Sequence, residues 1–428
     1  MDIISTRSNE AVSVDVAIKT GLAPDGGLYI PKSLPKFNNL KELRSMSLQE
    51  FASTFLSPFL NSFLTDDEIY KLCTDSFNFP LNFKKLNHRE NCYLMELFHG
   101  PTAAFKDFGA QFLANFLNLE KVKRNEKKLI LVATSGDTGG AVASAFHKKS
   151  DFNVAIFFPK DKVSLRQKYQ LTCWDNNIKS FEVDGSFDDC QSIVKSLMVN
   201  YREDFNFGSA HSINLGRLLP QAVYHAYTAI HLFHSSSNLI DFIIPTGNLG
   251  NALACVWARE MGMPINSITL ATNNNATLSD FFQTGTYTSR KSIPTLANAM
   301  DVGDPSNFER LQSLYPDILS EELKLSACRV SDDQIKEVIN DVYQTEKEII
   351  CPHTATGIYA FDKSHSTNIS VVAATAHPCK FNEIVSPLIG KPIDLNDAMM
   401  QLESRPTCFE TVLFDVPVIA EKLANWYR

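Results

Sequence analysis

The sequence predicts an α/β protein in which helices cover parallel sheets arranged in two lobes. From about residue 95 onwards, short apolar or β-branched runs alternate with helical stretches. Such alternation is typical of right-handed crossovers between parallel strands. Two of the turns that lead from a strand into a helix are small and rich in glycine. The residues before this point lack the alternation, so they are predicted to precede the lobes as a separate region.

The N-terminal region, residues 1–95, is predicted to be a mostly helical domain. Phe51, Phe55 and Phe59 recur every fourth residue, which places them on one face of a helix. The second domain is predicted to span residues 96–428. Its smaller α/β lobe should cover about residues 125–235, and the larger lobe should come from the remainder.

Six strands are expected in the second domain, and most of them lead into a helix. The strands are expected at residues 129–133, 154–158, 181–183, 242–244, 267–271 and 370–374. Helices are expected at residues 139–147, 165–173, 188–199 and 251–260. A longer helix, rich in leucine, alanine and aromatic residues, is expected at residues 214–233, where it would join the lobes.

Composition excludes several classes of protein. The chain has 428 residues, of which 44% are hydrophobic and 21% charged, as in soluble globular domains. Its 40 Lys and Arg residues against 48 Asp and Glu residues give a net charge of −8. A negative balance offers no general attraction to nucleic acid or to anionic lipid. We therefore expect neither a nucleic acid nor a membrane as partner.

The cysteines and the apolar runs predict a cytoplasmic protein. The nine cysteines are odd in number and form no C-x-x-C pair, so we expect reduced thiols and no metal site. No basic segment leads into an apolar one after Met1. No apolar run approaches the ~18 residues that are needed to cross a bilayer.

Both glycine-rich turns are suited to binding an anion. The first reads TSGDTGG at residues 134–140, and the second reads PTGNLGN at residues 245–251. Glycine permits close approach of the backbone, and the first turn of the following helix offers unpaired N–H groups. Neither turn matches the dinucleotide motif G-x-G-x-x-G or the P-loop. The turns therefore favour a different phosphorylated cofactor.

One lysine and one threonine complete the candidate site. Lys106 lies between aromatic residues, just before the first strand–helix unit. Packing of its aliphatic chain on a helix would explain such a lysine. Burial would also lower its pKa and free the amine to attack a carbonyl group. Thr375 follows the last predicted strand, where its hydroxyl would meet the same ligand.

Four segments, taken together, resemble the threonine synthases. These are pyridoxal-phosphate enzymes of the tryptophan-synthase-β fold type, and the likeness is to their long-chain bacterial and fungal branch. The segments are HGPTAAFKDF around Lys106, TSGDTG and PTGNLGN in the two turns, and TAHPCKF from Thr375 onwards. The likeness also covers residues 25–29, 212–217 and 298–302, and it spans nearly the whole chain.

The resemblance implies pyridoxal 5'-phosphate as cofactor and a role for each matching residue. Lys106 would hold the cofactor as a Schiff base and then move protons at Cα and Cβ of the substrate. The cofactor phosphate would be held by Gly247, Asn248, Leu249, Gly250 and Asn251. Thr375 would form a neutral hydrogen bond with the pyridine nitrogen.

The implied reaction converts the small molecule O-phospho-L-homoserine and water to L-threonine and phosphate. This is the work of a carbon–oxygen lyase in threonine biosynthesis. The substrate carboxylate would be held by Ser135, Gly136, Asp137 and Thr138. Asp137 needs a proton or a partner to accept a second carboxylate beside it, and many relatives of the wider fold type have Asn there. Lys162 and Arg217 are the cations expected to bind the substrate phosphate.

Two other functions stay open on the sequence alone. A hydroxyamino-acid dehydratase or β-replacement enzyme of the same fold type would share the turns and the lysine. The N-terminal region and the ATAHP segment at residues 374–378 are evidence against it. A non-catalytic protein that binds a phosphorylated ligand would keep the turns without needing Lys106. We expect a monomer or a weak homo-oligomer in each case.

Overall fold

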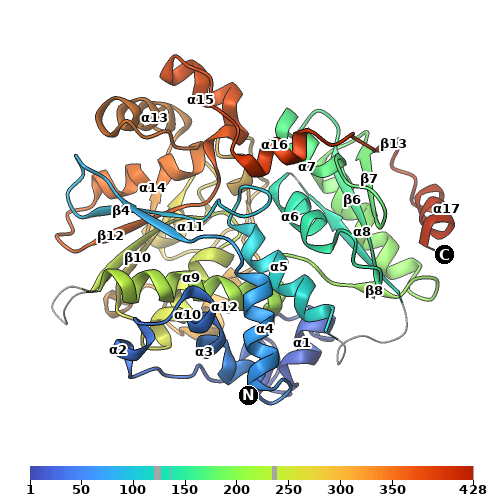
Figure 1. The fold of residues 1–428 in the computed structure, drawn as a ribbon, viewed down its shortest axis with the longest axis horizontal. Helices are drawn as coiled ribbons and strands as arrows, with labels where there is room; N and C mark the ends of the chain where they lie inside the picture. The colour runs from blue at the N-terminus through green and yellow to red at the C-terminus, as the bar shows by residue number, and fades with distance from the viewer. Residues whose placement is uncertain (120–126, 135, 234–238, 428) are drawn as a thin grey trace.

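Two sheets form the frame of the molecule, one in each lobe (Figure 1). The computed structural model describes residues 1–119, 127–134, 136–233 and 239–427. The six-stranded sheet has the order β11-β10-β9-β12-β4-β3, and the five-stranded sheet has the order β13-β7-β6-β5-β8. Apart from the antiparallel pair β3–β4, the neighbours in both sheets are parallel. The predicted α/β class is therefore confirmed.

The six-stranded sheet is covered by helices on both faces, so its two central strands are buried along their whole length. Its strands are β3 (Asn82–Lys85), β4 (Cys92–Glu96), β9 (Ile240–Pro245), β10 (Ile265–Thr272), β11 (Leu325–Arg329) and β12 (Ser370–Ala374). Every residue of β9 and β12 is buried, as expected of a parallel sheet between two helical layers. Helices α13 (Asp332–Glu346) and α14 (Pro352–Lys363) lie on one side, and α10 (Gly250–Glu260) lies on the other (Figure 1).

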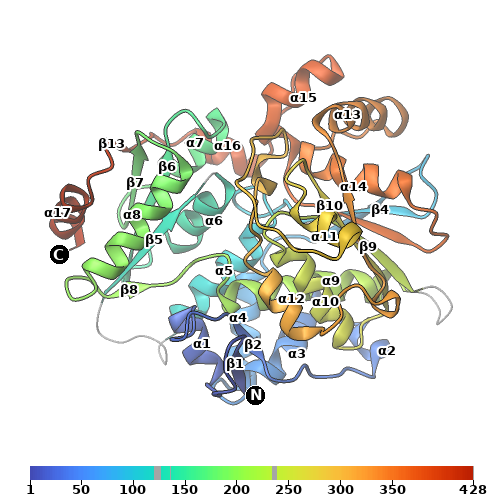
Figure 2. The ribbon, with the colours of Figure 1, turned by 180° about the vertical axis from the view of Figure 1, so that it is seen from behind.

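The five-stranded sheet has the same plan on a smaller scale. Its strands are β5 (Lys128–Ala133), β6 (Phe152–Pro159), β7 (Ile178–Val183), β8 (Phe207–Gly208) and β13 (Glu410–Val412). Helices α6 (Asp137–Phe146), α7 (Leu165–Thr172), α8 (Phe187–Asn200) and α17 (Val416–Tyr427) surround it. The last strand and helix return to this lobe from the far end of the chain, as Figure 2 shows.

The N-terminal region is mostly helical, as predicted. It contains α1 (Val14–Thr20), α2 (Leu40–Leu43), α3 (Leu48–Leu60) and α4 (Asp66–Ser76), and a small antiparallel pair, β1 (Ile3–Ser5) with β2 (Tyr29–Pro31). Phe51, Phe55 and Phe59 are fully buried on one face of α3. Strands β3 and β4 extend the six-stranded sheet before residue 96. The predicted boundary at residue 95 therefore cuts through β4.

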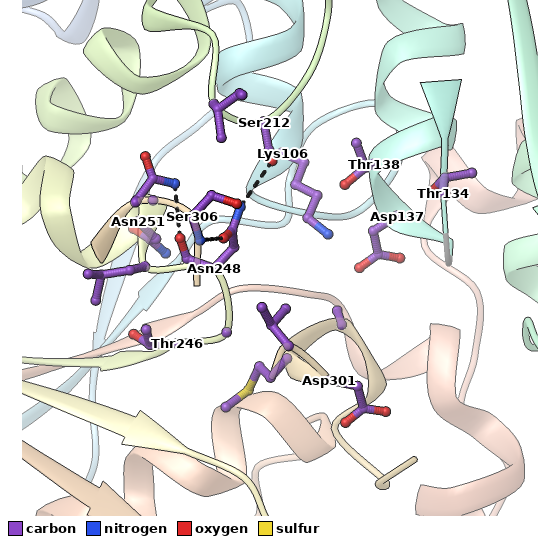
Figure 3. A pocket seen from close by; sticks show the side chains of 18 of the residues that line it. Lys106, Thr134, Asp137, Thr138, Ser212, Thr246, Asn248, Asn251, Asp301 and Ser306 are labelled. Carbon is purple, nitrogen blue, oxygen red and sulfur yellow. Dashed lines mark hydrogen bonds between the residues drawn. The ribbon is translucent and has the colours of Figure 1, made fainter. Parts of the chain in front are cut away.

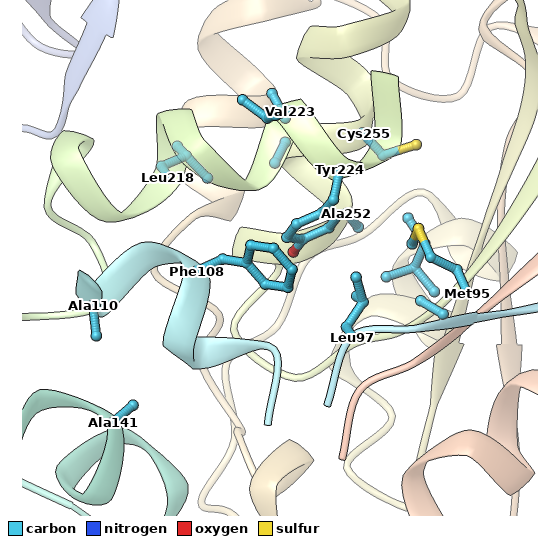
Figure 4. Packing of buried hydrophobic residues seen from close by; sticks show 14 of the residues in the cluster. Met95, Leu97, Phe108, Ala110, Ala141, Leu218, Val223, Tyr224, Ala252 and Cys255 are labelled. Atoms are coloured by element: carbon cyan, nitrogen blue, oxygen red, sulfur yellow. The ribbon is translucent and has the colours of Figure 1, made fainter. Parts of the chain in front are cut away.

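Two helices form the junction between the lobes. Helix α5 (Lys106–Leu117) packs on α9 (Leu215–Leu232), and the rings of Phe108 and Tyr224 lie 5.1 Å apart at this contact (Figure 4). A Cβ atom at Gly109 would lie 2.7 Å from the carbonyl oxygen of Arg217, so only glycine allows the two backbones to approach so closely. The apolar contact fixes α5, and with it Lys106, against the larger lobe.

The remaining helices line the surface around this frame. They are α11 (Thr277–Thr284), α12 (Phe308–Leu314), α15 (Asn382–Ile389) and α16 (Asp397–Glu403), with short 3₁₀ turns η1 (Asn298–Met300), η2 (Glu321–Leu323) and η3 (Pro378–Phe381). The six strands and the helices predicted in the second domain are confirmed. In the part of the chain that the structure describes, no helix is both long and apolar enough to span a bilayer.

Candidate active site

A cavity of about 600 Å³ lies where the turns of the two sheets face each other. The smaller lobe contributes Thr134, Asp137 and Thr138 (Figure 3). The larger lobe contributes residues 245–251 and Thr375. Its volume is typical of a small-molecule site. Both glycine-rich turns predicted from the sequence thus meet at one cavity, as expected for the carboxyl ends of parallel strands.

Lys106 is the first residue of α5 and reaches into this cavity. The pKa of its amine is lowered to about 8, mainly by burial; Asp137 raises this pKa, whereas Arg217 and Lys380 contribute to lowering it. The amine points toward Asp137 (Figure 3) and lies 5.8 Å from the ring centre of Phe105. With such a pKa, roughly a tenth of the amine is uncharged at pH 7, so a nucleophile is present near neutral pH.

Backbone hydrogen bonds bring Thr375 beside Lys106. The N–H of Phe105 donates to the carbonyl of Thr375 over 2.9 Å, and the N–H of His377 donates to the carbonyl of Ala103 over 3.0 Å. Ala103 adopts a positive φ of 55° to make this connection, which is costly for a residue with a Cβ atom. Thr375 is 5% exposed and lines the cavity.

The turn between β9 and α10 has the geometry of an anion cradle. Its predicted residues, Gly247 to Asn251, all line the cavity. Leu249, directly before the helix, has a φ of 62°, and a Cβ atom at Gly247 would lie 2.7 Å from Cα of Met300. A strained, glycine-dependent turn at a helix N-terminus is typical of phosphate binding.

The side chain of Asn251 is held with its amide nitrogen free. Its Oδ1 accepts hydrogen bonds from the hydroxyl of Tyr224 and from Nε2 of His225, each over 2.7 Å. Burial lowers the pKa of His225 to about 4, so this ring is neutral and donates through Nε2. The buried Nδ2 of Asn251 has no protein partner. A buried donor without a partner at the lining of a cavity indicates a ligand acceptor.

The turn between β5 and α6 is shaped by Thr134. Its hydroxyl oxygen accepts from the N–H groups of Gly136 and Gly139, each over 3.0 Å. Gly136 adopts a φ of 142°, which favours glycine. Asp137 and Thr138 line the cavity, whereas Gly136 is not among the described residues that line it. Ser135 lies outside the described residues.

Asp137 forms a buried ion pair that the sequence did not predict. Its Oδ1 lies 2.7 Å from Nζ of Lys380, and the two side chains are 4% and 0% exposed. Burial alone would raise the pKa of Asp137, but Lys380 and Lys106 outweigh it and hold this pKa well below its usual range. Lys380 lies in the TAHPCKF segment. Lys380 thus lies in a segment that the sequence analysis singled out, but the sequence did not indicate that it contacts Asp137.

The two candidate cations for a substrate phosphate are placed differently. Arg217 is 3% exposed, lines the cavity and donates through Nη1 to the carbonyl of Ala210 over 3.0 Å. Its Nε is buried without a protein partner, and burial lowers its pKa only to about 10, so it is charged at neutral pH. Lys162 is exposed between β6 and α7, and it is not among the described residues that line the cavity.

Several other lining residues were missed at the level of the sequence, because they lie in no glycine-rich turn. They are His211, Arg290, Lys291, Asp301 and His353. His353 accepts from the N–H of Ala299 through Nε2 over 3.1 Å, and burial lowers its pKa to about 4. In the described part of the chain, no group of three or more His, Cys, Asp or Glu side chains is placed to hold a metal ion.

Comparison with known proteins identifies the family. The model of pyridoxal-phosphate dependent enzymes matches residues 77–373, and models of the threonine synthase N terminus and C-terminal part match residues 2–77 and 354–421. The chain belongs to the threonine synthase family. It is 33% identical to threonine synthase from Haemophilus influenzae over 91% of both chains, and 31% identical to that from Escherichia coli over 97% of both.

Solved structures agree with this membership. The pyridoxal-phosphate-bound threonine synthase from Brucella melitensis is 31% identical, with a TM-score of 0.93 over 100% of both chains. The yeast threonine synthase has a TM-score of 0.90 and is 27% identical, over 99% of this chain and 98% of that one. The similarity to solved threonine synthases thus extends over the whole length of the chain.

The residues of this cavity fit the family's cofactor. The free Nδ2 of Asn251 and the start of α10 offer donors to a phosphate. The amine of Lys106, with its lowered pKa, is suited to bond with an aldehyde carbon. A hydroxyl side chain, Thr375, lines the same cavity.

Proposed function

We propose that this member of the family is a threonine synthase in which Lys106 is the catalytic residue. The enzyme converts O-phospho-L-homoserine and water to L-threonine and phosphate. The observation that supports this most strongly is that the buried amine of Lys106 and the cradle at residues 247–251 line the same cavity. Pyridoxal phosphate, when bound there, accepts the electron pairs that are released at Cα and Cβ of the amino acid.

Lys106 holds the cofactor and then moves protons. Its amine would hold the cofactor at the carbonyl carbon until the amino group of the substrate takes its place. The freed amine removes the protons from Cα and Cβ, and the bond between Cγ and the phosphate oxygen then breaks. Water adds its hydroxyl at Cβ, and protons return to Cγ and Cα. A pKa near 8 suits this alternation between base and acid near neutral pH.

The cofactor is held at both ends by the larger lobe. The N–H groups at the start of α10 and the amide of Asn251 would bind its phosphate, together with the backbone of Gly247, Leu249 and Gly250. Asn248 orders this turn, because its Oδ1 accepts from the N–H of Ser306 over 2.6 Å. At the other end, Thr375, which lines the cavity, would hold the pyridine nitrogen through a neutral hydrogen bond from its hydroxyl.

The substrate is held by the smaller lobe and by the junction. Its carboxylate binds at the start of α6, at the turn that contains Ser135, Gly136, Asp137 and Thr138. Its phosphate binds the charged guanidinium of Arg217. Lys162 remains the second candidate cation, and it would have to approach from the surface.

We also propose that the enzyme works in the cytoplasm as a monomer or a weak homo-oligomer, without a nucleic acid partner. The net charge of −8 supports the absence of nucleic acid. Native mass spectrometry measures the oligomeric state directly. A stable complex of fixed stoichiometry at nanomolar concentration would contradict it.

Product identification tests the function. The purified protein, loaded with pyridoxal phosphate, should form threonine and inorganic phosphate in equal amounts from O-phospho-L-homoserine. Serine, threonine and O-acetylserine should be poor substrates, because each leaves the phosphate-binding donors unpaired. Rapid conversion of O-acetylserine and sulfide would instead indicate a β-replacement enzyme, and deamination of threonine would indicate a dehydratase.

A further inference from the structure

The ion pair between Lys380 and Asp137 joins the two lobes at the edge of the cavity. Asp137 begins α6 in the smaller lobe, while Lys380 lies in η3, which follows β12 of the larger sheet. Lys380 also donates to the carbonyl of Thr102 over 3.0 Å. Asp137 lines the cavity, whereas Lys380 is not one of the described residues that do so. Among the residues that line the cavity, the lysine forms its ion pair with Asp137, and its charge also lowers the pKa of Lys106.

Asp137 presents a difficulty for an amino-acid substrate. Under the proposed function, on which this inference rests, the substrate carboxylate binds at the start of α6. Two carboxylates that share a buried site cannot both remain ionised without a counter-charge. The N-terminus of α6 supplies only part of a positive charge, so a full cation is needed beside Asp137.

We propose that Lys380 is a positioning residue that neutralises Asp137, so that the carboxylate of the amino-acid substrate can bind next to it. The contact of 2.7 Å and the near-complete burial of both side chains make this pair strong enough to persist when a ligand arrives. Gln167 supports the same oxygen, because its Nε2 donates to Oδ1 of Asp137 over 3.3 Å.

The other groups around Asp137 are unsuited to this task. Lys106 on α5 and His353 on α14 both act on Asp137. Lys106 is committed to the cofactor under the proposed function. His353 has its pKa lowered to about 4 by burial, so it carries no charge near neutral pH. The thiol of Cys351, before α14, has a pKa raised by burial and is uncharged too. Lys380 also acts on the buried carboxylate of Asp107 on α5, but among these groups it is the one that forms an ion pair with Asp137 and has no role toward the cofactor.

The test separates neutralisation from a merely structural role by comparing two ligands. L-2-aminobutyrate and propylamine differ only in the carboxylate, and neither contains phosphate. Their dissociation constants are measured from the absorbance of the bound cofactor in the holoenzyme, at pH 6, 7 and 8. Each variant is compared with the unmodified protein at the same pH, which cancels the titration of the ligands themselves.

Lys380→Met should weaken L-2-aminobutyrate selectively. The unneutralised Asp137 must then take a proton before a second carboxylate can bind, so the loss should grow with pH. Above the new pKa of Asp137 the loss increases about tenfold per pH unit, and we expect at least about a tenfold loss at pH 8. Propylamine should change less than about threefold, because it lacks the group that Asp137 repels. An equal loss for both ligands, or one that does not vary with pH, would overturn the proposal.

Two further variants keep the test decisive if Lys380→Met does not fold. Lys380→Arg keeps the charge and should restore the pH-independent binding. Lys380→Met combined with Asp137→Asn removes both charges, so the selective loss should disappear at every pH. The double variant could bind L-2-aminobutyrate as poorly as Lys380→Met, or its loss of affinity could still grow as the pH rises. Either result would show that Asp137 is not the group that Lys380 neutralises.

Lys168→Met is the matched control, because Lys168 pairs with Glu182 within the smaller lobe and is not among the described residues that line the cavity. It should leave the affinity for both ligands unchanged. The assay does not depend on the phosphate ester. A protein that formed no threonine from O-phospho-L-homoserine would fail the proposed function, while the pH-dependent loss would still decide the role of Lys380.

Discussion

The two glycine-rich turns occupy equivalent places in the two sheets but differ in charge. The turn at residues 245–251 contains no ionisable side chain, and Asn251 is held by the neutral side chains of Tyr224 and His225. The turn at residues 134–140 contains Asp137, which is paired with Lys380 from the other lobe. Two parallel sheets can thus each place an anion site at the carboxyl end of a strand, while a few buried charges determine which anion each site accepts.

Lys106→Ala removes the group that lies between the two turns and should have the largest effect. Turnover should fall by at least about 10³-fold, because the variant loses both the covalent anchor and the base. Far-ultraviolet circular dichroism should be unchanged. Threonine and phosphate formation measures the loss, and borohydride reduction of the unmodified protein should attach the cofactor to Lys106. A trapped cofactor on another lysine, or unaltered rates, would remove Lys106 from the mechanism.

Arg217→Met and Lys162→Met test which of the two cations binds the substrate phosphate, while the charged turn binds the substrate carboxylate. Arg217→Met should raise KM for the phosphorylated substrate by roughly 10–100-fold, since a charge-assisted hydrogen bond contributes about 1.5–3 kcal/mol. The absorbance of the bound cofactor should remain. Lys162 is exposed outside the cavity lining, so we expect its substitution to change KM less than about twofold. The reverse order of effects would restore Lys162 as the phosphate ligand.

Asn251→Ala tests the neutral turn. The dissociation constant of pyridoxal phosphate should rise about tenfold or more, because a buried donor to the phosphate is lost. KM for the substrate, measured at saturating cofactor, should stay within about twofold, since the substrate binds at the other turn. Equilibrium dialysis and steady-state kinetics give the two values. A rise in KM without a change in cofactor affinity would mean that the two turns had been assigned to the wrong anions.

The pKa of Lys106 predicts how cofactor capture depends on pH. Only the uncharged amine attacks the aldehyde, so capture by the cofactor-free protein should accelerate about tenfold per pH unit below the pKa. The rate should level off above about pH 8, the pKa of Lys106. Asp137→Asn should move this midpoint to lower pH, because the carboxylate favours the charged amine. Stopped-flow absorbance measures the rate, and a midpoint near pH 10 would show that Lys106 is not desolvated.

Thr375→Asp should affect turnover more than cofactor binding. An aspartate favours a protonated pyridine nitrogen and changes how the ring stores electrons, so kcat should fall about tenfold. Cofactor affinity should change little, because the phosphate is held at the neutral turn. Paired measurements of kcat and of cofactor affinity check this expectation. Unchanged turnover with a collapse in affinity would mean that the ring lies elsewhere.

The sequence predicted what is local, and it missed what depends on contacts between distant segments. Strands β9 and β12 were predictable because burial on both faces favours apolar runs, here at residues 242–244 and 371–374. Strand β3 is mostly exposed and polar, and β13 has only three residues. Neither strand therefore has an apolar run from which a strand could be predicted. Their places are determined by pairing with neighbours.

The same contrast holds in the candidate site. Lys106, Thr375 and the residues 247–251 each lie within a recognisable segment, and the structure brings them to one cavity. The pairing of Lys380 with Asp137 could not be predicted, since it depends on how η3 meets α6. Lys162 directly follows a strand of the smaller lobe, yet its turn faces solvent. A residue's distance from a strand end does not determine the direction of its side chain.

The position of β12 determines when during synthesis the active site can form. β12 lies between β9 and β4 in the six-stranded sheet, although it is made long after both of them. Until residue 374 has left the ribosome, β9 and β4 each present an unpaired edge. The carbonyl of Thr375, which accepts from the N–H of Phe105, is also still missing. The contact that holds Lys106 in place therefore cannot form until residue 375 of the 428 has been synthesised. Before that point the chain has unpaired strand edges, which favour aggregation, and an incomplete cofactor site.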